Sequence, residues 1–351
     1  MKNKNRIKYL ILFLGCVTTA LKAQVSKPYN TAYTTLEALC NAPETRNFKK
    51  AVFTVEKAFL DNKMTEKDFE SGISALFQLA KARYKHIDLD KKVSETEQMK
   101  RYASLFKVMT DTTFVVGLDE TLFHPPFRYN FDDMFGRKDW ASMFVSKLMA
   151  TNQGNCHSMP YLYKILCDEW QIPCYMALAP NHIYIKLFTE KTGWFNTELT
   201  SASFPIDAWL MASGYINIEA IQNGIYMDTL SEKQSLALCI LDLAKGYDRT
   251  YPINDGAFIV KCCDLALTHY PKSLNARILK AETKKKQFEK LMKARGISAP
   301  SVFWLEKDGK TLWDDMNSLY AQIHNLGYRA MPENMYVDWL KSSEQERFKQ
   351  K

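Results

Sequence analysis

The middle third of the chain switches from helical to strand-like hydrophobic spacing, and this switch is the strongest constraint on the fold. Apolar side chains recur along one helical face at Leu162, Ile165, Leu166 and Trp170. Pro173 then ends the helical pattern. Three β-like segments follow, at 174–179, 182–188 and 194–200. A helix followed by consecutive strands predicts an α+β fold with a small core.

The regions on either side of this core are expected to be helical. Apolar residues recur at helical spacing through most of 35–110, with capping-box-like pairs at Thr65 with Asp68 and at Ser94 with Glu97. A β-like stretch at 112–117 and a helix at about 140–149 are also expected. We therefore divide the chain into a helical region at 24–120 and a core at 121–230.

The C-terminal third divides into two further regions. Helical stripes at 231–296 are similar to a tetratricopeptide-type unit, although no clean repeat of about 34 residues is present. We interpret these helices as a binding site for a protein partner or as a packing appendage. Residues 297–351 are rich in aromatic side chains and are expected to fold, without an assigned role.

The first residues predict export. Basic residues precede an apolar run at 9–17, and small residues follow at 18–23, which is the layout of a secretory signal peptide cleaved after Ala23. The run is too short for a membrane-spanning helix. The alternative is a lipoprotein junction at Gly15-Cys16, with Cys16 acylated. We expect an exported protein, periplasmic or extracellular, without an integral membrane segment in the mature chain.

Charge and cysteine content limit the function. Residues 1–23 carry five basic groups and no acid, so the formal charge falls from +8 to +3 on cleavage. No basic cluster with interleaved aromatics is present, and a nucleic-acid partner is not expected. The mature chain keeps seven of the eight cysteines, so at least one thiol stays unpaired. No CxxC or HxxxH spacing occurs, and we expect no metal site and no cofactor. Three cysteines are interpreted as ordinary buried side chains: Cys239, Cys262 and Cys263.

Cys156 is the candidate nucleophile, because it lies at the start of the central helix, where helix amides and a nearby imidazolium lower the pKa of a thiol. Gly154 would permit the tight turn, and free amides around Asn155, Cys156 and His157 would hold an oxyanion. Pro160 has no N–H for the carbonyl of Cys156. The helix is therefore expected to begin nearer Ser158, with Ser158 as its N-cap.

His182 is the candidate general base and Glu198 the candidate orienting acid. His157 is the rival base, but it adjoins the cysteine and has no acid nearby in the sequence. A three-residue hairpin loop at 190–192, which Gly193 favours, would oppose His182 to Thr200 and make Glu198 a diagonal neighbour on the same face, whereas a two-residue loop would not. Asn196 is the alternative third member.

The order and spacing of these segments resemble the transglutaminase-like superfamily, with its papain-like core. The resemblance covers about residues 130–210, and its motifs are Gly154-Asn155-Cys156, Trp170-Gln171-Ile172-Pro173, Asn181-His182-Ile183-Tyr184 and Trp194-Phe195-Asn196-Thr197-Glu198-Leu199-Thr200. It implies Cys156 as nucleophile, His182 as base and Glu198 in the position that aspartate usually holds.

Two functions from different classes follow. The first is a cysteine hydrolase or acyltransferase that acts on an amide bond of a peptide, protein or cell-wall substrate through a Cys156 thioester. The second is a catalytically inactive transglutaminase-like module or scaffold that binds a partner through its helical regions.

Overall fold

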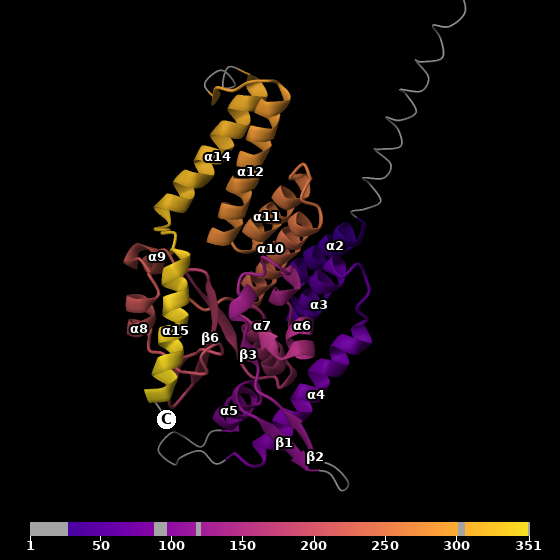
Figure 1. Ribbon diagram of the computed structural model, residues 1–351, viewed down its shortest axis with the longest axis vertical. Helices are drawn as coiled ribbons and strands as arrows, with labels where there is room; N and C mark the ends of the chain where they lie inside the picture. The colour runs from indigo at the N-terminus through magenta and orange to yellow at the C-terminus, as the bar shows by residue number, and fades with distance from the viewer. Residues whose placement is uncertain (1–26, 88–96, 117–120, 301–305, 350–351) are drawn as a thin grey trace, which may run out of the picture.

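The computed structural model describes residues 27–87, 97–116, 121–300 and 306–349 (Figure 1). It is a mixed α+β structure in which helices predominate and the sheets are small, as the sequence predicts. Residues 1–26, which hold the expected signal peptide and the alternative anchor Cys16, lie outside the described residues, as does Ser94. No helix in the described ranges is long and apolar enough to cross a membrane.

The expected N-terminal helices are confirmed. They are α2 (Lys27–Asn41), the 3-10 turn η1 (Pro43–Thr45), α3 (Phe48–Phe59), α4 (Glu66–Tyr84) and α5 (Glu97–Thr110). The cap at Thr65 is formed, because its hydroxyl accepts from the Asp68 amide at 3.1 Å. Each helix buries the apolar face that its spacing predicts; in α4 the buried residues are Phe69, Ile73, Leu76 and Ala80.

In the part of the chain that the structure describes, three small sheets lie near the middle. β1 (Thr113–Val116) pairs with β2 (Thr121–His124), and β3 (Arg128–Tyr129) pairs in parallel with β4 (Gln153–Gly154). The antiparallel sheet of β5 (Tyr175–Ala179), β6 (His182–Thr189) and β7 (Gly193–Thr197) follows α7 (Ser158–Glu169) and contacts it. Thr189 lies opposite Gly193, so the predicted three-residue loop at 190–192 is confirmed.

The prediction of one continuous helix at about 140–149 is wrong. The segment 140–149 divides into the 3-10 turn η3 (Trp140–Met143) and the helix α6 (Val145–Thr151), separated by extended backbone at Phe144. The cause is a long-range contact: the buried carboxylate of Glu56 accepts from the amides of Val145 and Ser146 at 2.7 and 3.0 Å. These bonds start a new helix where the local pattern continues the old one.

The C-terminal half is helical. After η2 (Phe131–Asp133) and the strands come α8 (Asp207–Ser213), α9 (Ile218–Gln222), α10 (Glu232–Thr250), α11 (Ala257–His269), α12 (Leu274–Ala294), α14 (Lys307–Asn325) and α15 (Glu333–Lys349). α10 contacts α11, α11 contacts α12, and α12 contacts α14. α14 and α12 project together from the body, and α15 returns to it beside α8 and α9 (Figure 1).

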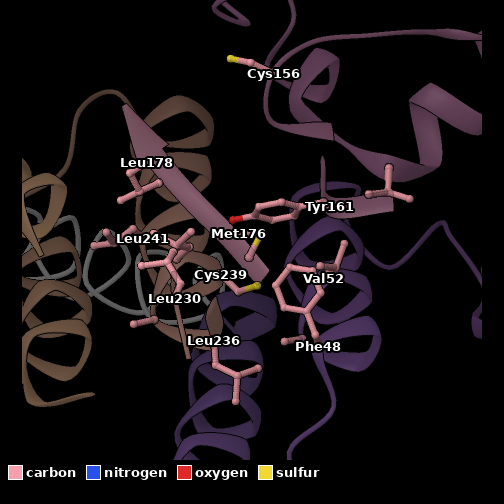
Figure 2. Packing of buried hydrophobic residues seen from close by; sticks show 14 of the residues in the cluster. Phe48, Val52, Cys156, Tyr161, Met176, Leu178, Leu230, Leu236, Cys239 and Leu241 are labelled. Atoms are coloured by element: carbon pink, nitrogen blue, oxygen red, sulfur yellow. The ribbon is translucent and has the colours of Figure 1, made fainter. Parts of the chain in front are cut away.

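A single hydrophobic cluster joins regions that the sequence separates. Figure 2 shows Phe48 and Val52 of α3 facing Tyr161 of α7, Met176 of β5 and Cys239 of α10. The Phe48 and Tyr161 rings meet edge to face at 5.0 Å. The same cluster reaches into α15, so the first and last described helices are parts of one core. Cys156 lies at the rim of this packing (Figure 2).

Candidate active site

The turn before α7 is held by Asn155. Its side-chain oxygen accepts from the amides of His157 and Ser158 at 3.0 and 3.1 Å, and the Ser158 hydroxyl accepts from the Asn155 amide at 3.1 Å. The helix begins at Ser158, as predicted. The prediction that Ser158 is the N-cap is wrong, because Asn155 makes the capping bonds and Ser158 is its reciprocal partner.

This capping changes the expected oxyanion donors. The amide of His157 is already bonded to Asn155, so it is not free. The amide of Cys156 makes no hydrogen bond with any described residue. The Asn155 side chain is occupied as well, since its amide nitrogen donates to the carbonyl of Met134 at 3.2 Å. Of the expected donors, the Cys156 amide alone stays available in the described structure.

Gly154 has a steric role. Its backbone is not in the left-handed region, so the turn itself does not need glycine. A Cβ atom at this position would lie 2.6 Å from the Ser158 hydroxyl oxygen and 2.7 Å from a Leu148 methyl carbon. Glycine is therefore required because α6 and the cap of α7 approach the backbone closely.

The candidate base and acid are in direct contact. His182 is the first residue of β6, and Glu198 follows the last residue of β7. The His182 Nε2 lies 2.5 Å from the Glu198 Oε2, and both side chains are buried. The other carboxylate oxygen accepts from the Thr200 amide at 2.9 Å and from its hydroxyl at 2.7 Å. The hairpin register thus brings Glu198 to His182, and Thr200 holds it in place.

The other imidazole nitrogen contacts the Tyr336 hydroxyl, which in turn contacts the thiol. The Tyr336 hydroxyl lies 3.1 Å from the Cys156 Sγ and 3.1 Å from the His182 Nδ1. The Cys156 Sγ also lies 3.6 Å from the carbonyl oxygen of Asn181. Cys156 is only 7% exposed. The three candidate residues are therefore linked in one chain of contacts, from the sulfur through the Tyr336 hydroxyl to the imidazole and from the imidazole to the carboxylate.

The charged forms of Cys156, His182 and Glu198 stabilise one another. Burial alone raises the pKa of the Cys156 thiol, but hydrogen bonding and positive charge from His182 lower it below its usual value. Burial lowers the pKa of His182, but the Glu198 carboxylate and the thiol raise it to about 10. Burial raises the pKa of Glu198, and the imidazolium holds it below its usual value. At neutral pH these shifts keep His182 as an imidazolium and Glu198 as a carboxylate, and they favour the thiolate form of Cys156.

Asn196, the alternative third member, is not at the site. Its amide nitrogen donates to the Pro205 carbonyl at 2.9 Å and to the Asp207 carboxylate at 2.7 Å. Across the ladder it faces Lys186, which lies four residues beyond His182 on β6. That separation is about 13 Å along a strand.

His157, the rival base, has its own acid. Its Nδ1 lies 2.8 Å from the Met143 carbonyl, and its Nε2 lies 2.9 Å from the carboxylate of Asp242 in α10. The expectation that His157 lacks an orienting acid is wrong, because that acid comes from a distant helix. Tyr161 also donates to Asp242, at 2.8 Å. These bonds tie α7 to α10, and both ring nitrogens of His157 are used in them.

Sequence reasoning missed three aromatic residues of the site. Tyr336 and Trp339 belong to α15, and Tyr129 ends β3. The Tyr129 hydroxyl lies 3.4 Å from that of Tyr336, and the Trp339 ring meets His182 edge to face at 4.6 Å. The spacing of Tyr336, Trp339 and Leu340 indicates a buried helical face, but no local signal connects it with Cys156.

The site holds no group of metal ligands. Among the described residues, no three His, Cys, Asp or Glu side chains lie close enough together to hold a metal ion. The seven cysteines from Cys40 to Cys263 are all free and buried. The expected burial of Cys239, Cys262 and Cys263 is confirmed. Comparison of the chain with models of protein families, with curated proteins and with solved structures gave no match.

Gly154→Ala should destabilise the protein by about 1–3 kcal/mol, because the new methyl group overlaps Ser158 and Leu148. Gly246→Ala is the matched control: it lies inside α10, where a Cβ meets its nearest neighbours at an ordinary 3.5 Å. That change should be neutral or stabilise by up to about 1 kcal/mol. Urea unfolding measures both, and equal effects at the two positions would contradict the steric role of Gly154.

Glu198→Gln should lower the free energy of unfolding by about 3–5 kcal/mol at neutral pH, because it leaves a buried imidazolium without its counter-charge. The folded state holds the pKa of Glu198 below the unfolded value of 4.5. The stability from its charge is therefore present above pH 4.5 and is lost as the pH falls through the folded pKa. The difference in free energy of unfolding between wild type and Glu198→Gln should therefore decrease in acid. The same difference for Ile185→Val, a buried control on β6, should not change with pH.

Proposed function

We propose that this protein is a transglutaminase-like cysteine hydrolase or acyltransferase that acts on an amide bond. The observation that carries the proposal is the buried set of contacts that links Cys156 through the Tyr336 hydroxyl to His182 and His182 to Glu198, in which the 2.5 Å contact orients the imidazole. A thiolate beside an imidazolium is an activated nucleophile. The motif resemblance noted in the sequence assigns the same three residues.

The chemistry follows from the atoms present. The Cys156 thiolate attacks the carbonyl carbon of the amide, a sulfur–carbon bond forms, and the carbonyl oxygen takes the negative charge. The unengaged Cys156 amide is the candidate donor to that oxygen. As the carbon–nitrogen bond breaks, His182 transfers its proton to the leaving amine, which leaves a thioester. Water or an amine then attacks the thioester and gives its proton to His182, and the sulfur departs as a thiolate.

The proposed setting comes from the N-terminus and the helical regions. The composition of residues 1–23 supports export to the periplasm or beyond the cell, with a lipid anchor at Cys16 as the alternative. The proposed substrate is an amide of a peptide, a protein or the cell wall. The tetratricopeptide-like helices α10, α11 and α12 are the proposed site for a protein partner.

One observation favours the second function, a non-catalytic binding module. Cys156 is only 7% exposed and Tyr336 covers it, which restricts access to the sulfur. The two functions differ in the reactivity of this thiol, which can be measured without knowledge of the substrate.

A fluorescent iodoacetamide probe at neutral pH should label Cys156 much faster than the other cysteines, because its pKa is lowered whereas burial raises that of Cys239. Cys156→Ala should abolish the rapid labelling and change the melting temperature little. Cys239→Ala is the control, since it should keep the labelling and lower stability. Rapid labelling that persists in Cys156→Ala would reject the catalytic proposal.

Against a reporter amide, Glu198→Gln should lower kcat about 10²–10⁴-fold, because the carboxylate orients His182 and stabilises its charge. Asn196→Ala should be milder, since its partners are Pro205 and Asp207. Steady-state rates of the two variants give the comparison. A larger loss for Asn196→Ala would assign the third role to Asn196 instead.

A further inference from the structure

The C-terminal helix brings a hydroxyl group to the nucleophile. Tyr336 in α15 lies 180 positions beyond Cys156, and its hydroxyl is 3.1 Å from the sulfur. The same hydroxyl is 3.1 Å from the His182 Nδ1 and 3.4 Å from the Tyr129 hydroxyl. It therefore contacts both reacting groups of the proposed site.

α15 is held in this position by several independent contacts. The Trp339 ring stacks on Trp209 of α8 at 5.9 Å and meets the His182 ring at 4.6 Å. An ion pair joins Glu333 to Arg137, and the Asn181 amide nitrogen donates to the Met331 carbonyl at 3.4 Å.

The side chains of Met331, Tyr336, Trp339 and Leu340 are buried in the main hydrophobic cluster. Undocking α15 would expose all of them to water, which is unfavourable. The helix is therefore better described as a wall of the site than as a removable cover.

The proton positions define what Tyr336 does. A thiolate accepts hydrogen bonds and donates none, so the hydroxyl beside it is the donor. The Tyr336 oxygen keeps its lone pairs for the His182 Nδ1–H and for the Tyr129 hydroxyl. Burial and the neighbouring thiolate raise the pKa of Tyr336 well above its ordinary value, so the phenol keeps its proton at neutral pH.

We infer that Tyr336 is a catalytic residue of this chain, whose hydroxyl donates to the Cys156 thiolate and helps to keep that sulfur ionised in a buried site. The inference rests on the proposed function, because it takes Cys156 as the nucleophile. It also gives residues 297–351 a role, which is to complete the active site from the far end of the chain.

The test is the rate of iodoacetamide alkylation of Cys156 as a function of pH, followed by intact-mass analysis. Tyr336→Phe removes the hydroxyl and keeps the ring. A hydrogen bond to a charged group is worth enough to move the midpoint of this profile upward by about one to two pH units. Alkylation at a pH below the wild-type midpoint should then slow by about tenfold or more.

Tyr184→Phe is the matched control. Tyr184 is a buried tyrosine two residues after His182 on β6, and its hydroxyl has no partner among the described residues. Its removal should leave the midpoint unchanged. If Tyr336→Phe fails to fold, ring-fluorinated tyrosine at position 336 decides the matter, because a more acidic phenol is a stronger donor and should lower the midpoint.

Two results would overturn the inference. An unchanged midpoint in the folded variant would limit Tyr336 to packing, and faster alkylation at every pH without a shifted midpoint would make α15 an inhibitory plug. Failure of the proposed function looks different, since rapid labelling would then survive in Cys156→Ala. A wild-type Cys156 with a depressed midpoint that Tyr336→Phe does not move would remove only the role of Tyr336.

Discussion

The contact between His182 and Glu198 is the interaction on which the rest of the site depends. Two buried ionised groups at 2.5 Å are stable only if the remaining polar atoms are satisfied, and Thr200 and Tyr336 satisfy them. The contact requires the hairpin register in which Thr189 faces Gly193, because a shift by one residue turns Glu198 to the other face of the sheet. A short loop thus controls the charge of the imidazole and, through it, the pKa of the thiol.

The start of α7 is the second constraint on the site, and it is held by hydrogen bonds between neighbouring residues. Asn155 caps the helix with local bonds, so that its own amide and those of His157 and Ser158 are bonded while that of Cys156 is left open. His157 then connects this helix to α10 through Asp242, and both side chains of this pair are buried. The candidate nucleophile therefore lies beside a second histidine and acid, which tie two helices together. Residue types alone do not distinguish the His182–Glu198 pair from the His157–Asp242 pair, whereas the direction of each side chain does.

The structure also relates the ends of the chain to its middle. α3 packs on α7, and α15 lies against the sheet and α8, so the described parts of 24–120 and 297–351 share one core with the proposed catalytic region. A site made in this way is complete only when α15 has packed onto the sheet and α8. Helices α10 and α11 pack in this core, as do the near ends of α12 and α14 through Leu274 and Ile323. The far ends of α12 and α14 project from the body (Figure 1) and form a separate small cluster around Phe288 and Met292.

The sequence by itself determined the local features: the helices of 35–110, the start of α7 at Ser158, the order of β5, β6 and β7, and the loop that sets their register. These depend on neighbouring residues, whose periodicity and turn preferences are visible in the chain. It also named Cys156, His182 and Glu198, because all three lie within one short helix-and-hairpin unit. Only the tertiary structure decided the break at Phe144, the acid for His157, and the place of Tyr336 beside the sulfur. Each of these depends on a partner from a distant segment, and the energy of such a contact comes from burial and pairing that exist only after the segments have packed together.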